Sequence, residues 1–332
     1  MPVPAGALRF NSDSGKLEYY NGEAWWQIDN FSADNATGGA RGVFGGGYLA
    51  PSVNVIEYIT ISTTGNSQDF GDLTLSTMMC GTAASITRGL FGGGSPFSNT
   101  ISYITISSTG NAQDFGDLSS ERRDFSLSSC SSSTRGLFVG GSISPGTPKV
   151  NVIEYVTISS LGDAKDFGDL SNERATVGTC GSSTRAIFAG GTINPAVAVN
   201  TIEFATFSTL GNSSDFGDLT SARTGPTSGC SNAVRGLFAG GATPGAVNTI
   251  DYITIASTGN AVDFGDLTVA RYHTGACSSP TRGVWVGGWK NPGYDDTIDY
   301  VTIMNTGNAI DFGNLLSARW GVAALSNAHG GL

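Results

Sequence analysis

Charged residues are scarce in this chain of 332 residues. They make up 13% of it, and 17 Lys and Arg are outnumbered by 27 Asp and Glu, for a formal net charge of −10. Proteins that bind nucleic acids carry basic patches, and no basic stripe is present here. No run of residues approaches the roughly 20 apolar residues of a membrane-spanning helix. We therefore expect neither nucleic-acid binding nor membrane insertion.

Histidine and cysteine are also few. The two histidines, His273 and His329, belong to no Ser-His-Asp order and no metal-ligand cluster, so we expect a non-enzymatic protein without metal or cofactor. Four of the five cysteines stand five residues before a repeated arginine, in a slot that holds Ala83 and Leu325 in other copies. This pattern indicates buried free thiols. Residues 1–4 lack the charged and apolar regions of a secretory signal.

Glycine is abundant, with 48 residues, and much of it lies in a block of about 48 residues that recurs six times after residue 40. Each copy contains Arg-Gly-apolar-aromatic-x-Gly-Gly or a close variant, then a segment such as Ile-Glu-Tyr, then a Thr-Gly-Asn-type turn. The copies end on Asp-Phe-Gly triplets that begin at Asp69, Asp114, Asp166, Asp215, Asp263 and Asp311. A period of this length, filled with short strand-like segments, predicts a β-propeller.

Each copy predicts four strands: a small-residue strand, the Arg-Gly strand, a strand rich in β-branched and aromatic residues, and the short Asp-Phe-Gly strand. In the third strand of the first copy, Ile56 and Tyr58 face one side, and Ile59 and Ile61 face the other. A sheet with two apolar faces is typical of a blade that is packed between two neighbouring blades.

The repeat resembles the kelch repeat. The shared features are Gly-Gly after an apolar strand, a tyrosine-bearing strand and an aromatic residue at the start of the fourth strand. The chain departs from the kelch pattern at Phe70 and its equivalents, where kelch repeats usually have tryptophan. The resemblance covers residues 41–332 and implies four-stranded propeller blades, but it implies little about function.

The two ends of the repeat region predict a closed ring. The chain enters the repeat at Arg41, on the second strand of a blade that lacks a first strand. Residues 317–327 match first-strand segments such as residues 221–232. We therefore predict an all-β protein with a six-bladed kelch-like propeller of four-stranded blades. The C-terminal strand joins the N-terminal blade and removes the open edges.

Residues 1–30 lie outside the repeat and predict a small three-stranded β-meander. A linker at residues 31–40 joins it to the propeller at residues 41–332. A sheet this small is marginally stable alone, so it should dock on the propeller, on copies of itself or on another protein. The expected attachment residues are Phe10, Tyr19, Trp25 and Trp26.

The meander is also similar to short modules that open tail-fibre and other virion proteins of tailed bacteriophages. The patterns that carry this resemblance are Arg-Phe-Asn, Gly-Lys-Leu-Glu-Tyr-Tyr and Asn-Gly-x-x-Trp. The resemblance implies attachment to other virion proteins through residues 1–30.

The acidic motifs of the repeat have several interpretations. Six copies of Asp-Phe-Gly in an all-β array do not fit a protein kinase, which has one copy that binds magnesium. We expect Asp72 and its equivalents to pair with a repeated arginine. Calcium binding by these carboxylates is the alternative, because calcium takes clustered oxygen ligands, but the spacing matches no calcium loop.

The connection between the second and third strands varies most in length between the copies, which indicates the rim that binds partners. Aromatic residues gather there around the last blade: its loop contains Trp289, Lys290 and Tyr294, and the flanking connections contain Tyr272 and Trp320. These residues fit a platform for a sugar ring or a protein. The alternative is packing between blades near the seam that closes the ring.

We therefore interpret the chain as a non-enzymatic bacteriophage virion structural protein. It would be a tail, fibre or collar component, assembled in multiple copies in the bacterial cytoplasm. Residues 1–30 would anchor it to other virion proteins, and the propeller would contact a host-surface glycan or protein, or other parts of the assembly. The alternative is a free-standing bacterial kelch-like or lectin-like binding or scaffolding module.

Overall fold

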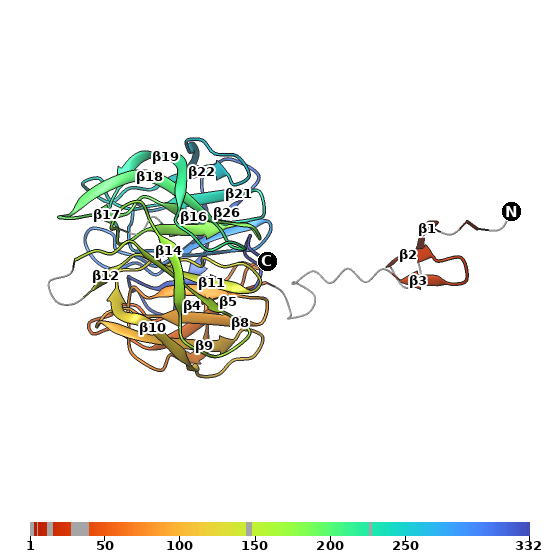
Figure 1. The fold of residues 1–332 in the computed structure, drawn as a ribbon, viewed down its shortest axis with the longest axis horizontal. Coiled ribbons are helices and arrows are strands. Elements are labelled where there is room, and N and C mark those ends of the chain that lie inside the picture. Colours follow the sequence, from red (N-terminus) through yellow and green to blue (C-terminus); the bar gives the residue numbers. More distant parts are fainter. Residues whose placement is uncertain (1–2, 5, 12–15, 28–39, 144–147, 226–227) are drawn as a thin grey trace. The chain divides into compact units, whose positions relative to one another are not determined.

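A computed structural model describes residues 3–4, 6–11, 16–27, 40–143, 148–225 and 228–332. The regular elements of this part of the chain are β-strands (Figure 1). They belong to two compact units, one within Met1–Gly38 and one within Gly39–Leu332. The described residues include no helix with the length and apolar character needed to cross a membrane. Apart from Ala40, the predicted linker lies outside the described residues.

The first unit is the predicted meander. Its antiparallel sheet has the order β1 (Leu8–Asn11), β2 (Lys16–Tyr20) and β3 (Trp25–Gln27). The turn before β3 forms because the Oδ1 of Asn21 accepts hydrogen bonds from the backbone N–H groups of Glu23 and Ala24, at 2.9 and 2.8 Å. Local turn chemistry and strand pairing thus suffice to define this sheet.

The expected attachment residues are distributed over this sheet. Tyr19 is 40% exposed, and Trp25 is half-buried beneath the Arg9 guanidinium, which lies 4.1 Å from its ring centroid. Phe10 and Trp26 lie on β1 and β3, and their side chains are outside the described part of the chain.

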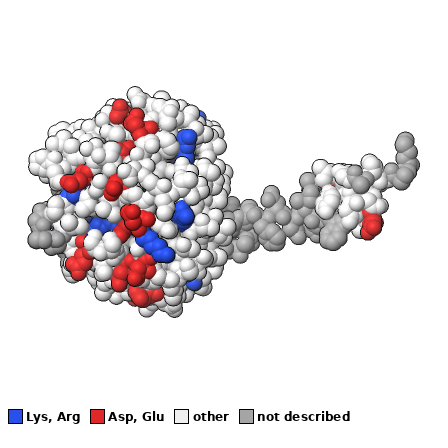
Figure 2. Space-filling view, viewed as in Figure 1, with Lys and Arg blue, Asp and Glu red and all other residues white. Residues whose placement is uncertain are grey.

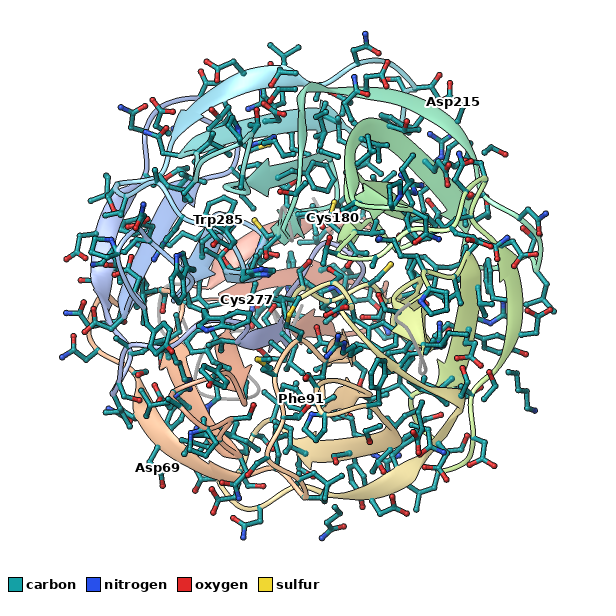
Figure 3. All side chains as sticks on the ribbon, turned by 90° about the vertical axis from the view of Figure 1, so that its left-hand side faces the viewer. Asp69, Phe91, Cys180, Asp215, Cys277 and Trp285 are labelled. Atoms are coloured by element: carbon teal, nitrogen blue, oxygen red, sulfur yellow. The ribbon has the colours of Figure 1, made fainter. Side chains whose placement is uncertain are left out.

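The second unit is a six-bladed β-propeller, whose blades surround a common axis (Figure 3). Asp69 and Asp215 lie at its circumference, and Cys180 and Cys277 lie near the axis. The first three blades are built from β28 (Ala323–Ser326), β4 (Arg41–Gly45), β5 (Val55–Thr60) and β6 (Gln68–Asp72); from β7 (Gly81–Ala84), β8 (Arg88–Gly92), β9 (Ser98–Thr105) and β10 (Gln113–Arg123); and from β11 (Arg135–Val139), β13 (Val152–Thr157) and β14 (Lys165–Asp169).

The other three blades have four main strands each, and two short strands extend the array. β12 (Ser142–Ile143) pairs with β10, and β17 (Thr192–Ile193) pairs with a strand of the fourth blade. The main strands are β15 (Gly178–Gly181), β16 (Arg185–Ala189), β18 (Val197–Thr206) and β19 (Ser214–Arg223); β20 (Ser228–Ser231), β21 (Arg235–Ala239), β22 (Thr249–Thr254) and β23 (Val262–Asp266); and β24 (Gly275–Ser278), β25 (Arg282–Val286), β26 (Thr297–Thr302) and β27 (Ile310–Asn314).

The predicted closure of the ring is confirmed. β28 pairs with β4 in antiparallel register, from Ala323 opposite Gly45 to Ser326 opposite Gly42. The backbone N–H of Arg41 also donates to the Oδ1 of Asn327 at 2.8 Å. The first blade is therefore assembled from the two ends of the repeat region.

The third blade departs from the predicted four strands, because its sheet has only β11, β13 and β14. The connection from Arg122 to Cys130 is two residues longer than the equivalent one from Arg174 to Cys180. The extra length carries the segment across the axis. There the carbonyl oxygen of Leu127 accepts hydrogen bonds from the N–H groups of two other blades, Ala276 at 3.3 Å and Ala324 at 3.1 Å.

The propeller has two rims. The turn rim carries the turns between the first and second strands and between the third and fourth strands. The opposite rim carries the loops between the second and third strands and the connections from each fourth strand to the next blade. It is called the cavity rim because a cavity opens there. Ala40 lies at the turn rim, because its carbonyl accepts the N–H of Ile61, just after β5, at 2.8 Å. The chain thus enters the propeller at the rim with the turns of constant length.

The C-terminal residues fill the axis at the turn rim. Residues 327–331 are buried, and the N–H of Gly330 donates to the carbonyl of Ser231 at 2.9 Å. The Nδ1 of His329 accepts the N–H of Gly331 at 3.1 Å, so its Nε2 carries the proton and donates to the Ala84 carbonyl at 3.0 Å. This arrangement accommodates only a neutral ring, and burial lowers the pKa of His329 to about 4.

The lowered pKa of His329 predicts acid sensitivity. Its folded-state pKa of about 4 lies below the usual 6.5, so the unfolded chain binds more protons between these values. The contribution of His329 is complete above pH 6.5 and should be lost as the pH falls to 4, a change of roughly 3 kcal/mol. We expect His329→Gln to lose that part of the pH dependence of urea unfolding. An identical pH profile for both proteins would contradict the buried neutral ring.

Arginine at the start of each second strand joins neighbouring blades. Each guanidinium lies over the aromatic ring of its own third strand, 4.5 to 5.0 Å from the centroid, and its Nη1 donates to a carbonyl of the next blade. The pairs are Arg41–Ile106, Arg88–Ile158, Arg135–Phe207, Arg185–Ile255, Arg235–Ile303 and Arg282–Ile61. Every seam of the ring has one such contact.

A second set of arginines forms buried ion pairs across five seams. The partners are Arg122–Glu154, Arg174–Glu203, Arg223–Asp251, Arg271–Asp299 and Arg319–Glu57. The prediction that Asp72 and its equivalents pair with these arginines is wrong. Asp72 lies half-buried at the end of the outermost strand, whereas Glu57 is completely buried on the third strand. A buried guanidinium requires an equally buried carboxylate, because both lose hydration.

The sixth seam lacks both partners. Thr77 stands at the arginine position and Ser102 at the acid position, and a cavity of about 170 Å³ opens there beside Phe91 and Phe97. The hydroxyls of Thr74 and Ser102 are 2.5 Å apart. The two charges are absent together. One charge alone would be buried without a partner, which would destabilise the fold by about 3–5 kcal/mol.

Restoring this sixth ion pair should reveal strong coupling. We expect Thr77→Arg alone and Ser102→Glu alone to destabilise the protein, because each buries one charge. The double variant should recover most of the loss, with a coupling energy of about 3 kcal/mol in a double-mutant cycle measured by denaturant unfolding. Strictly additive effects would show that the two positions do not correspond to the pairs in the other seams.

The cysteines are all free and buried, as predicted. Their slot explains one glycine of the repeat. A Cβ atom placed on Gly236 would lie 2.7 Å from the Sγ of Cys180, and one on Gly283 would lie 2.6 Å from the Sγ of Cys230. At these seams the inner strand thus packs against the neighbouring blade's Arg-Gly strand at a distance that leaves no room for a Cβ, whereas the fourth blade has Ala186 at this position.

Candidate functional site

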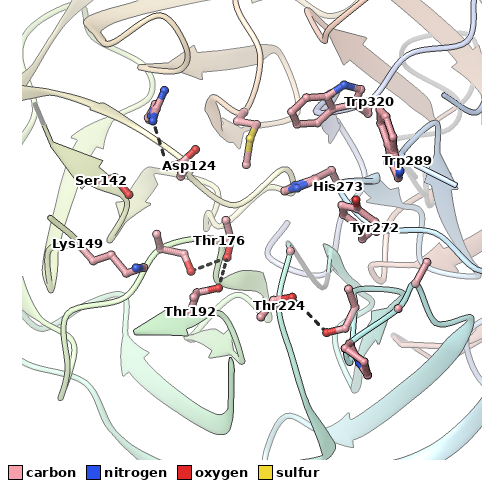
Figure 4. Close-up of a pocket in the computed structure, with 18 of the residues that line it drawn as sticks. Asp124, Ser142, Lys149, Thr176, Thr192, Thr224, Tyr272, His273, Trp289 and Trp320 are labelled. Carbon is pink, nitrogen blue, oxygen red and sulfur yellow. Dashed lines mark hydrogen bonds and ion pairs between the residues drawn. The ribbon is translucent and has the colours of Figure 1, made fainter. Parts of the chain in front are cut away.

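A cavity of about 740 Å³ opens at the axis on the cavity rim (Figure 4). Six short backbone pairings, one per blade seam, surround the axis at this rim and supply much of the cavity lining. In each pairing, the residue after the arginine position meets the residue after Gly-Gly. The pairs are Trp320–Tyr48, Met78–Ser95, Arg123–Ser142, Ala175–Thr192, Thr224–Ala242 and Tyr272–Trp289.

An inner ring of six equivalent residues surrounds the axis in the left-handed backbone region. Their φ values lie between 56° and 73°, at Met79, Asp124, Thr176, Gly225, His273 and Gly321. This conformation lets backbone groups bond from blade to blade. The N–H of Gly321 reaches the carbonyl of His273 at 3.0 Å, and that of Thr176 reaches the carbonyl of Asp124 at 2.7 Å.

Four members of the inner ring keep a side chain although glycine suits the backbone better. Left-handed backbone costs about 1–2 kcal/mol for most residues other than glycine. Met79, Asp124, Thr176 and His273 all line the cavity. Backbone strain of this kind gathers at functional sites. The side chains at these four positions therefore mark the cavity as the candidate site.

One wall of the cavity is aromatic. The ring of His273 lies 4.9 Å from that of Tyr272 and 5.0 Å from that of Trp320, and Trp289 meets Trp320 edge-on at 6.4 Å. These residues come from the last blade and the two connections that flank it. They present ring faces and edges toward the cavity (Figure 4).

The facing wall is polar (Figure 4). Arg123 lies 4.6 Å from the ring centroid of Phe97, and its Nε is 3.5 Å from a carboxylate oxygen of Asp124. The ammonium of Lys149 donates to the amide oxygen of Asn194 at 3.4 Å. Hydroxyls complete this wall at Ser142, Thr176, Thr192 and Thr224. The cavity thus combines stacking surfaces with hydrogen-bonding groups.

The aromatic wall also contains two buried polar atoms without a hydrogen-bond partner in the described part of the chain. The Nε1 of Trp320 and the Nδ1 of His273 are buried and have no hydrogen-bond partner among the described residues. Such atoms are rare in folded proteins, because each forfeits its hydration. Burial lowers the pKa of His273 to about 4, so its ring is neutral at physiological pH.

The structure separates the residues proposed from the sequence. Tyr272, Trp289 and Trp320 line the cavity together. Tyr294 lies behind them, 5.3 Å from the Trp289 ring and 6.0 Å from the Tyr48 ring. These contacts fit the packing interpretation, whereas the cavity lining fits the ligand interpretation.

Lys290 does not line the cavity, because its ammonium binds the buried carboxylate of Asp295 at 2.9 Å. The lining residues with charged or imidazole side chains were not singled out from the sequence; they are His273, Arg123, Asp124 and Lys149. A signal for His273 was present, since its slot holds glycine in two other copies, Gly225 and Gly321. A glycine in a repeated slot suggests left-handed backbone.

No cluster of three or more His, Cys, Asp or Glu side chains that could hold a metal ion occurs in the described ranges. A scan against protein-family models and a search of curated proteins found no match for this chain. The resemblances to kelch repeats and to tail-fibre modules therefore depend only on the sequence motifs that carry them.

Strain at the inner ring can be measured at His273. His273→Ala and His273→Gly both remove the imidazole, but only glycine relieves the left-handed backbone. We expect the free energy of unfolding of the glycine variant to be about 1 kcal/mol higher than that of the alanine variant. At the neighbouring Tyr272, which is not in this conformation, alanine should be the more stable of the pair. The same order at both positions would contradict strain at His273.

Proposed function

We propose that this chain is a non-enzymatic structural protein of a bacteriophage virion, a tail, fibre or collar component with a kelch-like propeller. The observation that carries the proposal is the polarity of the propeller. The chain enters at the turn rim, beside Asn327, and the cavity opens at the other rim. A host-surface molecule that enters the cavity would therefore approach the rim opposite to the one at which the chain enters the propeller.

The N-terminal sheet supplies the anchor in this proposal. Leu8 is 63% exposed and Tyr19 is 40% exposed, so apolar surface is available on a sheet of only three strands. Small sheets of this kind gain stability by docking. The proposed attachment residues to other virion proteins are Phe10, Tyr19, Trp25 and Trp26, with the chain present in multiple copies and assembled in the bacterial cytoplasm.

The arrangement of the cavity supports binding and not catalysis. The Nδ1 of His273 has no hydrogen-bond partner among the described residues, so no described carboxylate orients this imidazole through that nitrogen as in a catalytic triad. Asp124 pairs with Arg123. Asp and Glu predominate over Lys and Arg on the face shown in Figure 2, which agrees with the net charge of −10 and does not favour nucleic acid as a partner.

A second candidate is a free-standing bacterial binding or scaffolding module, lectin-like in character. One observation favours it: the residues that line the cavity all belong to the propeller. The two candidates differ in what residues 1–30 do, because only a virion protein needs them for incorporation into a particle.

Incorporation into particles tests the proposal. In phage particles purified from the producing host, mass spectrometry should detect the full chain. A variant lacking residues 1–30 should retain its β-rich circular dichroism spectrum but be missing from the particles. The control variant Trp289→Ala should be incorporated normally. Absence of the full chain from purified particles would contradict the virion assignment and favour the free-standing module.

A further inference from the structure

We infer that the axial cavity binds the terminal, carboxylate-bearing sugar of a glycan. The ring would stack on the aromatic wall of Tyr272, Trp289 and Trp320, and the carboxylate would lie at Lys149. This inference rests on the proposed function, since it names the class of surface molecule that the propeller contacts. It concerns the propeller alone and can be tested on the isolated full chain.

The blocked axis selects the end of a glycan. The segment around Leu127 crosses the channel and bonds to Ala276 and Ala324, and its side chain is completely buried. Ser128 adds a bond on each side, because its Oγ accepts the N–H of Gly229 at 3.2 Å and donates to the carbonyl of Thr179 at 2.9 Å. A ligand can therefore enter only from the cavity rim, and a chain cannot pass through.

The aromatic wall matches the apolar face of a pyranose. Trp289 and Trp320 meet at an interplanar angle of 89°, so one ring can offer its face while the other offers its edge. Carbohydrates combine a C–H face with hydroxyls around the ring. A rigid aromatic surface beside hydrogen-bonding groups is suited to such amphipathic ligands.

The hydroxyl groups of the polar wall match sugar hydroxyls. Ser142, Thr176, Thr192 and Thr224 line the cavity. A hydroxyl both donates and accepts, so it can bond to the hydroxyls around a sugar ring. An apolar ligand would offer these groups no hydrogen bond, and this disfavours an aliphatic or aromatic occupant.

The charges of the cavity favour an anionic sugar. Among the described lining residues, Arg123, Asp124 and Lys149 carry full charges, which leaves one net positive charge in a protein of net charge −10. Arg123 is paired with Asp124, whereas the partner that Lys149 has among the described residues is the neutral amide of Asn194. Lys149 is therefore the cation that is available to a carboxylate inside the cavity.

Matched sugars test the inference directly. Binding of galacturonate and galactose, and of glucuronate and glucose, to the full chain is measured by calorimetry and saturation-transfer NMR. Each pair differs only in its carboxylate. We expect at least one acid to bind about tenfold more tightly than its neutral partner, with an affinity that falls as salt is raised.

Variants assign the contacts. Lys149→Gln should weaken binding of the acidic sugar about tenfold and leave that of the neutral sugar unchanged. The matched control Lys165→Gln changes an exposed lysine on β14 that does not line the cavity, and it should bind as the parent does. Trp289→Ala should abolish binding of every sugar while the thermal unfolding midpoint shows that the propeller is still folded.

Several results would overturn the inference: no binding of any of the four sugars, equal affinity for both members of each pair, or no effect of Lys149→Gln. Equal binding of a short poly-glutamate peptide would indicate an acidic peptide as the ligand instead. None of these outcomes bears on incorporation into particles, so failure of the sugar assignment is distinguishable from failure of the virion assignment.

Discussion

The short ladder between β28 and β4 is the interaction on which the rest of the structure depends. Each blade exposes apolar residues on both faces of its sheet and buries them only between two neighbours. The ring therefore needs every seam between blades, and the ladder between β28 and β4 completes the first blade, which joins two of these seams. Four residue pairs form this ladder, and the ion pair of Arg319 with Glu57 reinforces it. The buried C-terminal residues then fill the axis behind it.

The seams show how a repeat tolerates buried charge. In five seams a guanidinium and a carboxylate are desolvated together, and in the sixth both are replaced by small neutral residues. Buried ion pairs contribute little net stability compared with apolar packing, but half a pair is strongly destabilising. Only the correct alignment of one blade on the next satisfies both charges of such a pair.

The candidate site depends on side chains that differ between blades at equivalent positions of a nearly symmetric backbone. The backbone repeats the same left-handed position six times, yet its side chains range from glycine to histidine and aspartate. Aromatic residues occupy one side of the cavity and polar residues the other. The rigid ring maintains the strained positions, because the bonds between inner-ring residues hold the backbone from both sides.

The sequence by itself determined the period, the number of blades, the closure by the C-terminal strand and the burial of the cysteines. These features follow from short-range patterns repeated in every copy, such as the burial of both faces around Ile56 and the glycine that admits Cys180. The meander was equally accessible, because tight turns and alternating residues define it locally.

Only the tertiary structure decided which carboxylate meets each arginine, where the third blade leaves its sheet, and which aromatic residues surround the cavity. Glu57 and Asp72 are both acidic and close in sequence, and depth in the fold distinguishes them. Two additional residues before Cys130 gave no local sign that the segment crosses the axis. Lys290 and Lys149 likewise differ through their neighbours in space, because one meets a buried carboxylate and the other a neutral amide.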